Sequence, residues 1–231
     1  MINLKIYIIH YTKLEERKKN ILSILETMPF EYEFIEKYDK EELTNNEIDS
    51  FYEINEKVFN QKSQLWGGNA NKFSQLSNSE ISCALKHIEA LKKIRDGSFY
   101  YNLILEDDVI INTKNFEQDI NNLLTKKRKW DVLFLGEGMG KKYREDKIGF
   151  RRLTPFQNIF KMSHPATNCL EAYIVKKNIT KKILDQLTPI NLAIDWELAY
   201  QFYKKDMKIF WTKKIIFKQG SKNNIYPSAL R

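Results

Sequence analysis

The chain has 231 residues, of which 42% are hydrophobic, and it carries 38 basic against 30 acidic residues for a formal net charge of +8. This length fits one domain with a substantial core, and the apolar content argues against wholesale disorder. The positive surplus favours an anionic partner, namely nucleotides, nucleic acid or an acidic membrane face, without choosing among them.

The chain opens with a βαβ pattern. Residues 4–9 are predicted to form a strand, residues 13–28 a helix that Pro29 ends, and residues 32–35 a second strand. This order favours a right-handed unit with parallel strands. The first ten residues form a short apolar strand rather than a signal peptide, and no segment reaches the roughly 18 apolar residues of a membrane span.

A polar stretch and a long helix come next. Residues 41–75 are interpreted as short helices and a mobile loop, which is either a functional lid or merely disordered. Ser77 and Glu80 fit a capping box, and the apolar stripe that follows indicates a helix ending at Gly97. His87 lies beside that stripe, where a structural role is commoner than a catalytic one.

The acidic run Glu106-Asp107-Asp108 follows the apolar residues 103–105 and precedes the apolar residues 109–111. A carboxylate beside a buried strand is costly to desolvate unless it gains a cation or strong hydrogen bonds. At the carboxyl end of a strand, these acids would face the crevice where open α/β sheets bind ligands. Their hard oxygens suit Mg²⁺ or Mn²⁺ bridging a diphosphate. The alternative is an acidic surface turn.

The second half continues the alternation of helices and strands, which favours a mostly parallel, doubly wound α/β sheet. The basic stretch 137–152 is either a solvated loop or a flap over an anionic substrate or membrane. Pro189 separates two of the helices. The expected elements are a helix over 115–127, strands over 130–136 and 172–175, helices over 178–187 and from Ala193, and closing strands over 209–211 and 215–217.

The two cysteines, Cys83 and Cys169, lack metal-type spacing, and a reducing cytosol is their simpler home. Cys83 lies among helical apolar residues, so we expect it to be a small core filler. Together with the missing signal peptide, this predicts a cytoplasmic protein.

Several separate segments resemble glycosyltransferase family 25, the group that includes bacterial lipooligosaccharide galactosyltransferases. The resemblance implies a type-A glycosyltransferase fold: one Rossmann-like domain over 1–231, with a nucleotide-sugar-binding half at 1–136 and an acceptor-binding half at 137–231. It also implies a divalent cation and inversion at the anomeric carbon. The matching segments are Ile6–Ile9 with Arg17, Leu76–His87, Leu103–Val109, Trp130–Gly136, Ala172–Val175 and Ile194-Asp195.

In such enzymes a short acidic motif holds the metal and the donor ribose, and Glu106, Asp107 and Asp108 correspond to it here. Asp108 is the first choice for metal contact, with Glu106 beside it. Distant collagen-modifying relatives have a metal-binding histidine where this chain has Gln219, so Gln219 is assigned to the metal or, with Lys222, to the diphosphate. The chain also departs from the family pattern at His10, Ser82 and Lys86, where asparagine, glycine and serine are usual.

The remaining assignments concern the donor and the base. We assign Ile9, His10, Tyr38 and Asp39, at the ends of the first two strands, to donor binding. The general base that takes the acceptor proton is assigned to Asp195, with Glu197 in reserve. A helix N-cap is the alternative role for Asp195. Trp66 and Trp196 are either stacking partners of the acceptor sugar or core residues. Thr167 and Asn168 are either partners of sugar hydroxyls or, the commoner case, turn residues.

The resemblance therefore implies an inverting transferase that moves a hexose, galactose first and glucose as the alternative, from a UDP-sugar to a lipooligosaccharide or other surface glycan. Mn²⁺ or Mg²⁺ is the expected cofactor, and the acceptor is expected to be lipid-linked at the cytoplasmic face of the inner membrane, where basic residues would contact anionic lipid. The competing readings are a basic nucleic-acid-binding protein, for which no motif is present, and a catalytically inactive relative that serves in protein interactions.

Overall fold

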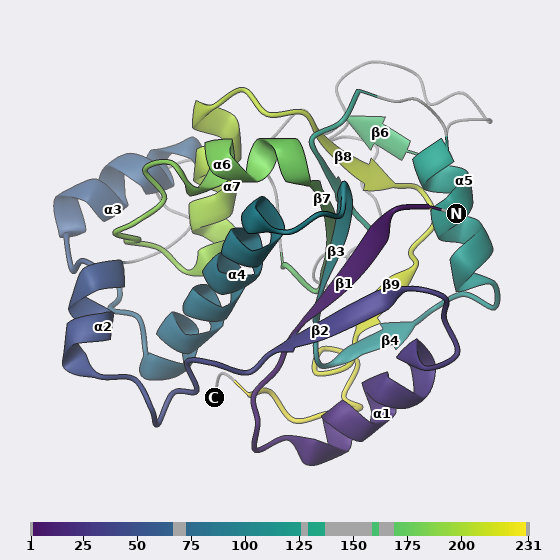
Figure 1. Cartoon of the computed structure of the whole chain (residues 1–231). Coiled ribbons are helices and arrows are strands. Elements are labelled where there is room, and N and C mark those ends of the chain that lie inside the picture. The colour runs from purple at the N-terminus through teal and green to yellow at the C-terminus, as the bar shows by residue number, and fades with distance from the viewer. Residues whose placement is uncertain (1, 67–72, 126–128, 137–158, 162–168, 230–231) are drawn as a thin grey trace.

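The structure is a computed structural model that describes residues 2–66, 73–125, 129–136, 159–161 and 169–229. A seven-stranded sheet forms its centre, in the order β2-β1-β3-β7-β5-β8-β6 (Figure 1). β7 runs antiparallel to both neighbours, as β6 does to β8, so the other five strands share one direction. In that order the strands are Glu31–Ile35, Leu4–Ile9, Tyr101–Glu106, Ala172–Lys176, Val132–Phe134, Ile209–Thr212 and Ile159–Lys161.

Helices cover both faces of this sheet (Figure 1). One layer contains α4, α6 and α7, with α2 and α3 beside it, and the other contains α1 and α5. The bounds are α1 Glu15–Leu25, α2 Asn45–Phe51, α3 Glu56–Ser63, α4 Asn78–Asp96, α5 Phe116–Thr125, α6 Lys177–Leu184 and α7 Ile194–Lys204, with a 3₁₀ turn at Gln64–Trp66.

Side chains of β1 alternate between the two hydrophobic cores. Tyr7 and Ile9 pack with the α4 layer, whereas Ile6 and Ile8 pack with the α1 and α5 layer. Successive strand residues point to opposite faces, so a strand covered on both sides must be apolar throughout. This is why β1 is an almost unbroken apolar run, and the predicted α/β class with a mostly parallel sheet is confirmed.

The capping box that begins α4 is present. Ser77 Oγ accepts from Glu80 N at 3.3 Å, and the Glu80 carboxylate accepts from Ser77 N at 2.8 Å. α4 then runs 19 residues and leads into β3, which pairs with β1 on the side away from β2. In this register Ile9 lies opposite Glu106. The carboxyl ends of β1 and β3 therefore meet at the point where the strand order reverses, which is where open α/β sheets bind ligands.

Two expectations need correction. The closing strand predicted over 215–217 starts only at Phe217, and it pairs with β4 (Val109–Ile111) in a separate two-stranded sheet as β9 (Phe217–Gln219). This pairing joins the segment after the acidic run to the start of the tail. The N-cap of α7 is Ala193, so the alternative role of Asp195 as an N-cap is wrong.

Several predictions concern residues that the structure does not describe. The basic stretch 137–152, Thr167 and Asn168 lie outside the described residues, as do residues 67–72 of the predicted lid. None of the helices that the structure describes combines the length and apolar character that a bilayer span requires.

Candidate active site

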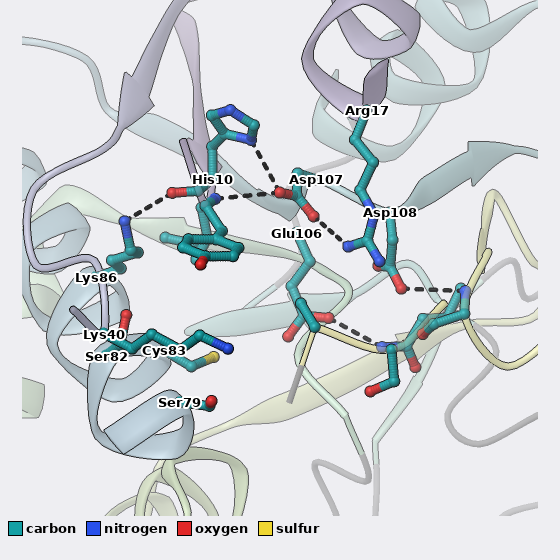
Figure 2. A pocket seen from close by; sticks show the side chains of 16 residues that line it. His10, Arg17, Lys40, Ser79, Ser82, Cys83, Lys86, Glu106, Asp107 and Asp108 are labelled. Atoms are coloured by element: carbon teal, nitrogen blue, oxygen red, sulfur yellow. Dashed lines mark hydrogen bonds and ion pairs between the residues drawn. The ribbon is translucent and has the colours of Figure 1, made fainter. Parts of the chain in front are cut away.

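A pocket opens at the carboxyl ends of β1 and β3, between the first turns of α4 and the C-terminal tail (Figure 2). Its walls combine backbone and side chains from segments far apart in sequence. They are Ile9, His10 and Tyr11 after β1; Arg17 of α1; Lys40; Ser79, Ser82, Cys83 and Lys86 of α4; Glu106, Asp107 and Asp108; and Gln219, Ser221, Ser228 and Ala229 of the tail.

Asp107 is fixed by three donors. Its Oδ2 lies 2.9 Å from His10 Nδ1 and accepts from Tyr11 N at 3.2 Å, while Oδ1 accepts from Arg17 Nη1 at 2.7 Å (Figure 2). Burial raises the pKa of Asp107, but the hydrogen bonds from His10 and Arg17 outweigh it and hold the pKa below its usual value. Asp107 is therefore an ionised anchor that ties β1 and α1 to the acidic run.

Asp108 has a different environment. It is buried, its Oδ2 accepts from Ser221 N at 3.1 Å, and its Oδ1 has no hydrogen-bond partner among the described residues. A buried carboxylate oxygen that lacks a partner carries an uncompensated desolvation cost. A divalent cation would remove that cost, so this side chain fits the ligand role predicted for it.

Glu106 lies beside Asp108 and lines the same pocket. Its Oε2 accepts from Gln219 Nε2 at 3.1 Å, and its side chain is 21% exposed. Burial, followed by the negative charges of Asp108, Asp107 and Asp195, raises the pKa of Glu106 to about 8. This crowding of negative charge is the pattern that a hard divalent cation neutralises, and carboxylate and amide oxygens are the ligands that Mn²⁺ and Mg²⁺ prefer.

The tail is held against the acidic run by main-chain contacts. Gly220 N donates to the carbonyl oxygen of Asp108 at 2.7 Å, and a Cβ at position 220 would lie 2.6 Å from that oxygen. Further along, Arg17 Nη2 donates to the Pro227 carbonyl, and the Arg17 guanidinium lies 5.4 Å from the ring centroid of Tyr226. Only a residue without a side chain allows the tail to approach Asp108 this closely at position 220. The tail is thereby held as one wall of the pocket.

Two of the predicted donor-binding residues, Asp39 and Tyr38, are not among the residues that line the pocket. Asp39 is buried, and its carboxylate accepts from Lys86 Nζ at 2.6 Å and from Thr12. Lys86 Nζ also donates to the carbonyls of His10, at 2.7 Å, and Glu36, at 3.0 Å. Tyr38 is buried with a positive φ of 74°. Asp39 and Tyr38 are outside the pocket lining, whereas the predicted Ile9, His10, Glu106, Asp107, Asp108 and Gln219 are all within it.

The two candidate bases also differ. Asp195, at the start of α7, is partly exposed, and its charge contributes to the raised pKa values of Glu106 and Cys83, so it lies near the acidic run. Burial raises the pKa of Asp195 itself. Glu197 is fully buried, and both of its oxygens accept from Lys62 Nζ at 2.7 Å. Glu197 therefore ties α7 to α3, and neither Glu197 nor Asp195 is among the residues that line the pocket.

Lys222, predicted near the diphosphate, is outside the lining and donates to Cys169 Sγ at 2.7 Å. Trp196 is partly exposed at the start of α7. The contact of Lys222 with the diphosphate and the stacking of Trp196 on the acceptor sugar remain predictions.

Sequence reasoning missed the wall that α4 provides. Ser79, Cys83 and Lys86 are spaced by four and three residues, so they share one face of the helix, and this polar face was the available signal. Arg17 was quoted for the resemblance but given no role in the site. It lies on the buried stripe of α1 with Ile21 and Leu25, and a charged residue in such a stripe indicates a buried ion pair.

One protein-family model matches most of the chain. The model of glycosyltransferase family 25, described as an LPS biosynthesis protein family, matches residues 3–198. No curated protein matches the chain in sequence.

The solved structures include S. aureus TarS, at 14% identity and a TM-score of 0.50, where the match covers 95% of this chain and 36% of that one. TarS 1–349 in complex with UDP-GlcNAc matches at 13% identity and a TM-score of 0.49, over 94% of this chain and 58% of that one. A glycosyltransferase involved in glycosylation of the major capsid of PBCV-1 matches at 12% identity and a TM-score of 0.40, over 94% and 91% of the two chains. The TarS match confirms the predicted type-A glycosyltransferase fold.

Proposed function

The chain belongs to glycosyltransferase family 25, and we propose on that premise that it is an inverting, metal-dependent transferase using a UDP-sugar donor. The proposed product is a hexosylated lipooligosaccharide or other surface glycan, with galactose as the first donor sugar to test and glucose as the second. In this proposal residues 1–136 bind the donor, and residues 137–231 bind the acceptor.

One observation carries the proposal: a buried carboxylate oxygen of Asp108 lies without a partner among the described residues, beside Glu106, at the switch point of the sheet. Asp108, Glu106 and Gln219 would hold Mn²⁺ or Mg²⁺. When bound, the cation offsets the charge of the departing diphosphate. Lys40 also lines the pocket, and its positive charge favours a diphosphate there.

Asp195 is the proposed general base. In the inverting step the acceptor oxygen forms a bond to the anomeric carbon as the bond to the UDP oxygen breaks, and the leaving diphosphate keeps the electron pair. The acceptor proton goes to the Asp195 carboxylate. Burial raises the pKa of Asp195, and a more basic carboxylate takes a hydroxyl proton more readily.

Thermal melting with UDP tests the donor site. The protein is heated alone, with Mn²⁺, with UDP, and with both together. We expect a rise in Tm with both that exceeds the sum of the separate effects, since a ligand at about 100 times its Kd stabilises by about 2.7 kcal/mol. Absence of any Mn²⁺-dependent protection by UDP would count against the proposal.

Two variants sharpen the test. Asp108→Asn is expected to keep the fold and lose the Mn²⁺-dependent protection and the transfer activity. Asp119→Asn is the matched control, because Asp119 pairs with Lys214 at 2.7 Å and does not line the pocket. Transfer or hydrolysis of a panel of UDP-sugars with Mn²⁺ then identifies the sugar, and protection without turnover of any of them would favour an inactive relative.

A further inference from the structure

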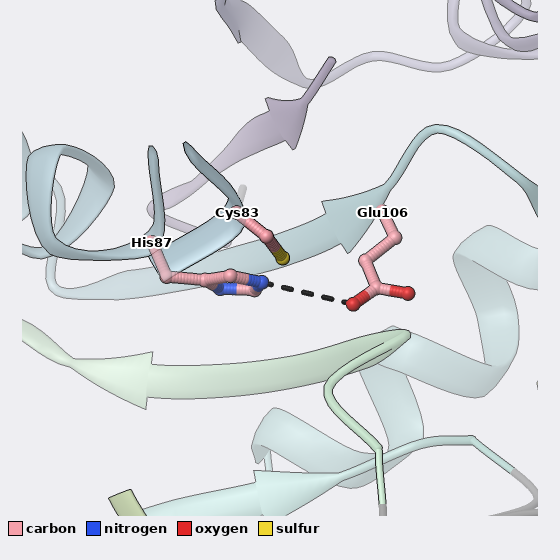
Figure 3. Close-up of side chains that lie close together, drawn as sticks. All are labelled: Cys83, His87 and Glu106. Atoms are coloured by element: carbon pink, nitrogen blue, oxygen red, sulfur yellow. Dashed lines mark ion pairs between the residues drawn. The ribbon is translucent and has the colours of Figure 1, made fainter. Parts of the chain in front are cut away.

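A second group of ligand-type side chains lies on the α4 side of Glu106. Cys83 and His87 are four residues apart on α4, and Glu106 ends β3 across from them (Figure 3). One ligand atom from each of these three residues lies within 4.8 Å of the other two. The proposed transfer step uses neither Cys83 nor His87, so their convergence on Glu106 needs a separate explanation.

The orientation of His87 supplies an independent observation. His87 is fully buried, and its Nε2 has no hydrogen-bond partner among the described residues. Its Nδ1 lies 3.1 Å from Tyr173 Oη, and the two rings are stacked at 23°. With the proton on Nδ1 and donated to Tyr173, the Nε2 lone pair faces Glu106, at 3.7 Å from Oε1. Metal-binding histidines are commonly held in this way by a partner on the other ring nitrogen.

We propose that Cys83, His87 and Glu106 form a three-ligand site for a borderline divalent cation, with Zn²⁺ as the first candidate. Sulfur, imidazole nitrogen and carboxylate oxygen together are a zinc-type ligand set, whereas Mn²⁺ and Mg²⁺ prefer oxygen alone. Zinc–nitrogen and zinc–oxygen bonds of about 2.0–2.2 Å place two such ligands of a tetrahedral ion about 3.3–3.5 Å apart. The 3.7 Å between His87 Nε2 and Glu106 Oε1 is slightly longer, and small side-chain rotations would bring both atoms and Sγ into place.

The site would have an open fourth position. Cys83 and Glu106 both line the pocket, so water or a ligand can reach an ion that they hold. On binding, the Cys83 S–H bond breaks and a bond from sulfur to zinc forms, the Glu106 carboxyl gives up its proton where it holds one, and the protons leave to bulk water through the pocket. Where the proposed function also holds, zinc would withdraw Glu106 from the donor cation, so Zn²⁺ is expected to inhibit transfer. The ligation itself does not depend on that function.

Co²⁺ is the probe, because a cobalt–thiolate bond gives a charge-transfer band in the near ultraviolet. We expect metal-free protein to develop this band with one Co²⁺ per chain, and equimolar Zn²⁺ to remove it. Cys83→Ser is expected to abolish the band, while Cys169→Ser keeps it. Wild-type protein without the band, or the same band in Cys83→Ser, would overturn the proposal.

Tyr173→Phe separates ligation from packing. The substitution removes only the hydroxyl that lies against His87 Nδ1, and we expect Co²⁺ affinity to fall about 10- to 100-fold while the melting temperature of the metal-free protein changes little. A merely structural histidine would leave Co²⁺ affinity unchanged. Where folding of a variant is in doubt, alkylation of the wild-type chain decides: Zn²⁺ should protect Cys83 from iodoacetamide and leave the rate at Cys169 unaltered. Equal rates at Cys83 with and without Zn²⁺ would also refute the site.

The two proposals fail separately. A cobalt band without Mn²⁺-dependent protection by UDP would support the zinc-type site and contradict the transferase proposal. Protection by UDP without a cobalt band would do the reverse.

Discussion

The three consecutive acids have three different environments. Asp107 is saturated by His10, Tyr11 and Arg17, Asp108 keeps an oxygen without a partner in the described part of the chain, and Glu106 lies between that oxygen and His87. The sequence predicted that acids at this place need a cation or strong hydrogen bonds. It could not show which of the three acids gains hydrogen bonds and which is left for a cation, because the partners of Asp107 are 90 or more residues away.

Asp107→Asn is expected to lower the free energy of unfolding by about 3–5 kcal/mol, because it leaves the buried Arg17 guanidinium without its counter-charge. Urea unfolding of this variant and of Asp108→Asn measures the contrast. Asp108→Asn should retain wild-type stability in the absence of metal, since its Oδ1 has no donor to lose among the described residues. Equal losses in both variants would contradict the separation of an anchor from a cation ligand.

Asp195→Asn is expected to reduce kcat by about 10²–10⁴-fold, the usual contribution of a general base, while the Kd for UDP with Mn²⁺ stays unchanged. Steady-state kinetics and UDP titration measure the two quantities. Loss of UDP binding would show that Asp195 does not act simply as the base.

At the scale of elements, periodicity located most helices and strands to within a few residues. The capping box at Ser77 and the apolar stripe after it predicted α4, and the alternation of the first half predicted β1 and β2. The β4–β9 pairing was not predicted, because two three-residue strands carry too little periodicity to show which strand they pair with. Glu197 was the reserve candidate for the base, and only the packing of α7 against α3 shows that it is held in a buried ion pair with Lys62.

The pH dependence of stability tests the contacts that Glu33 of β2 makes with two neighbouring elements. Its carboxylate binds Lys5 of β1 at 2.7 Å and Lys93 of α4 at 2.8 Å. Burial raises the pKa of Glu33, but the hydrogen bonds from Lys5 and Lys93 outweigh it, so the net pKa is lowered from its ordinary 4.5. A pKa lowered in the folded state means stabilisation that is fully present above the unfolded value and is lost as pH falls through the folded one.

We therefore expect Glu33→Gln to lower the free energy of unfolding by about 0.5 kcal/mol at pH 7, a small value because the side chain is 33% exposed and screened by solvent. The difference from the wild type should vanish in urea titrations at the acid end, below the folded pKa. A difference that stays constant with pH would mean that the ion pairs are not its source.

At the scale of the whole molecule, the sequence predicted the α/β class and the two helical layers, and family membership agrees with both. The pocket itself could not be predicted from the sequence. Its walls come from β1, α1, α4, the acidic run and a tail that returns from residue 219 onward, and nothing in a linear pattern shows that these segments meet.

The net charge of +8 makes a prediction about membranes. We expect the protein to sediment with vesicles containing phosphatidylglycerol at low salt, to be released as salt rises, and to ignore pure phosphatidylcholine, because each basic residue near an anionic surface contributes about 1 kcal/mol that salt screens. Equal binding to neutral vesicles would remove the electrostatic explanation. Salt-sensitive binding to oligonucleotides without protection by UDP would favour a nucleic-acid role instead.

The contact between Gly220 and Asp108 has a consequence for how this centre can be damaged. A methyl group at position 220 would clash with the acidic run, because it would lie 2.6 Å from the Asp108 carbonyl oxygen. It would displace Asp108, the proposed cation ligand, while leaving every ionisable group in the chain intact. A substitution at this position would therefore inactivate the site through a steric clash, although no reactive side chain is changed.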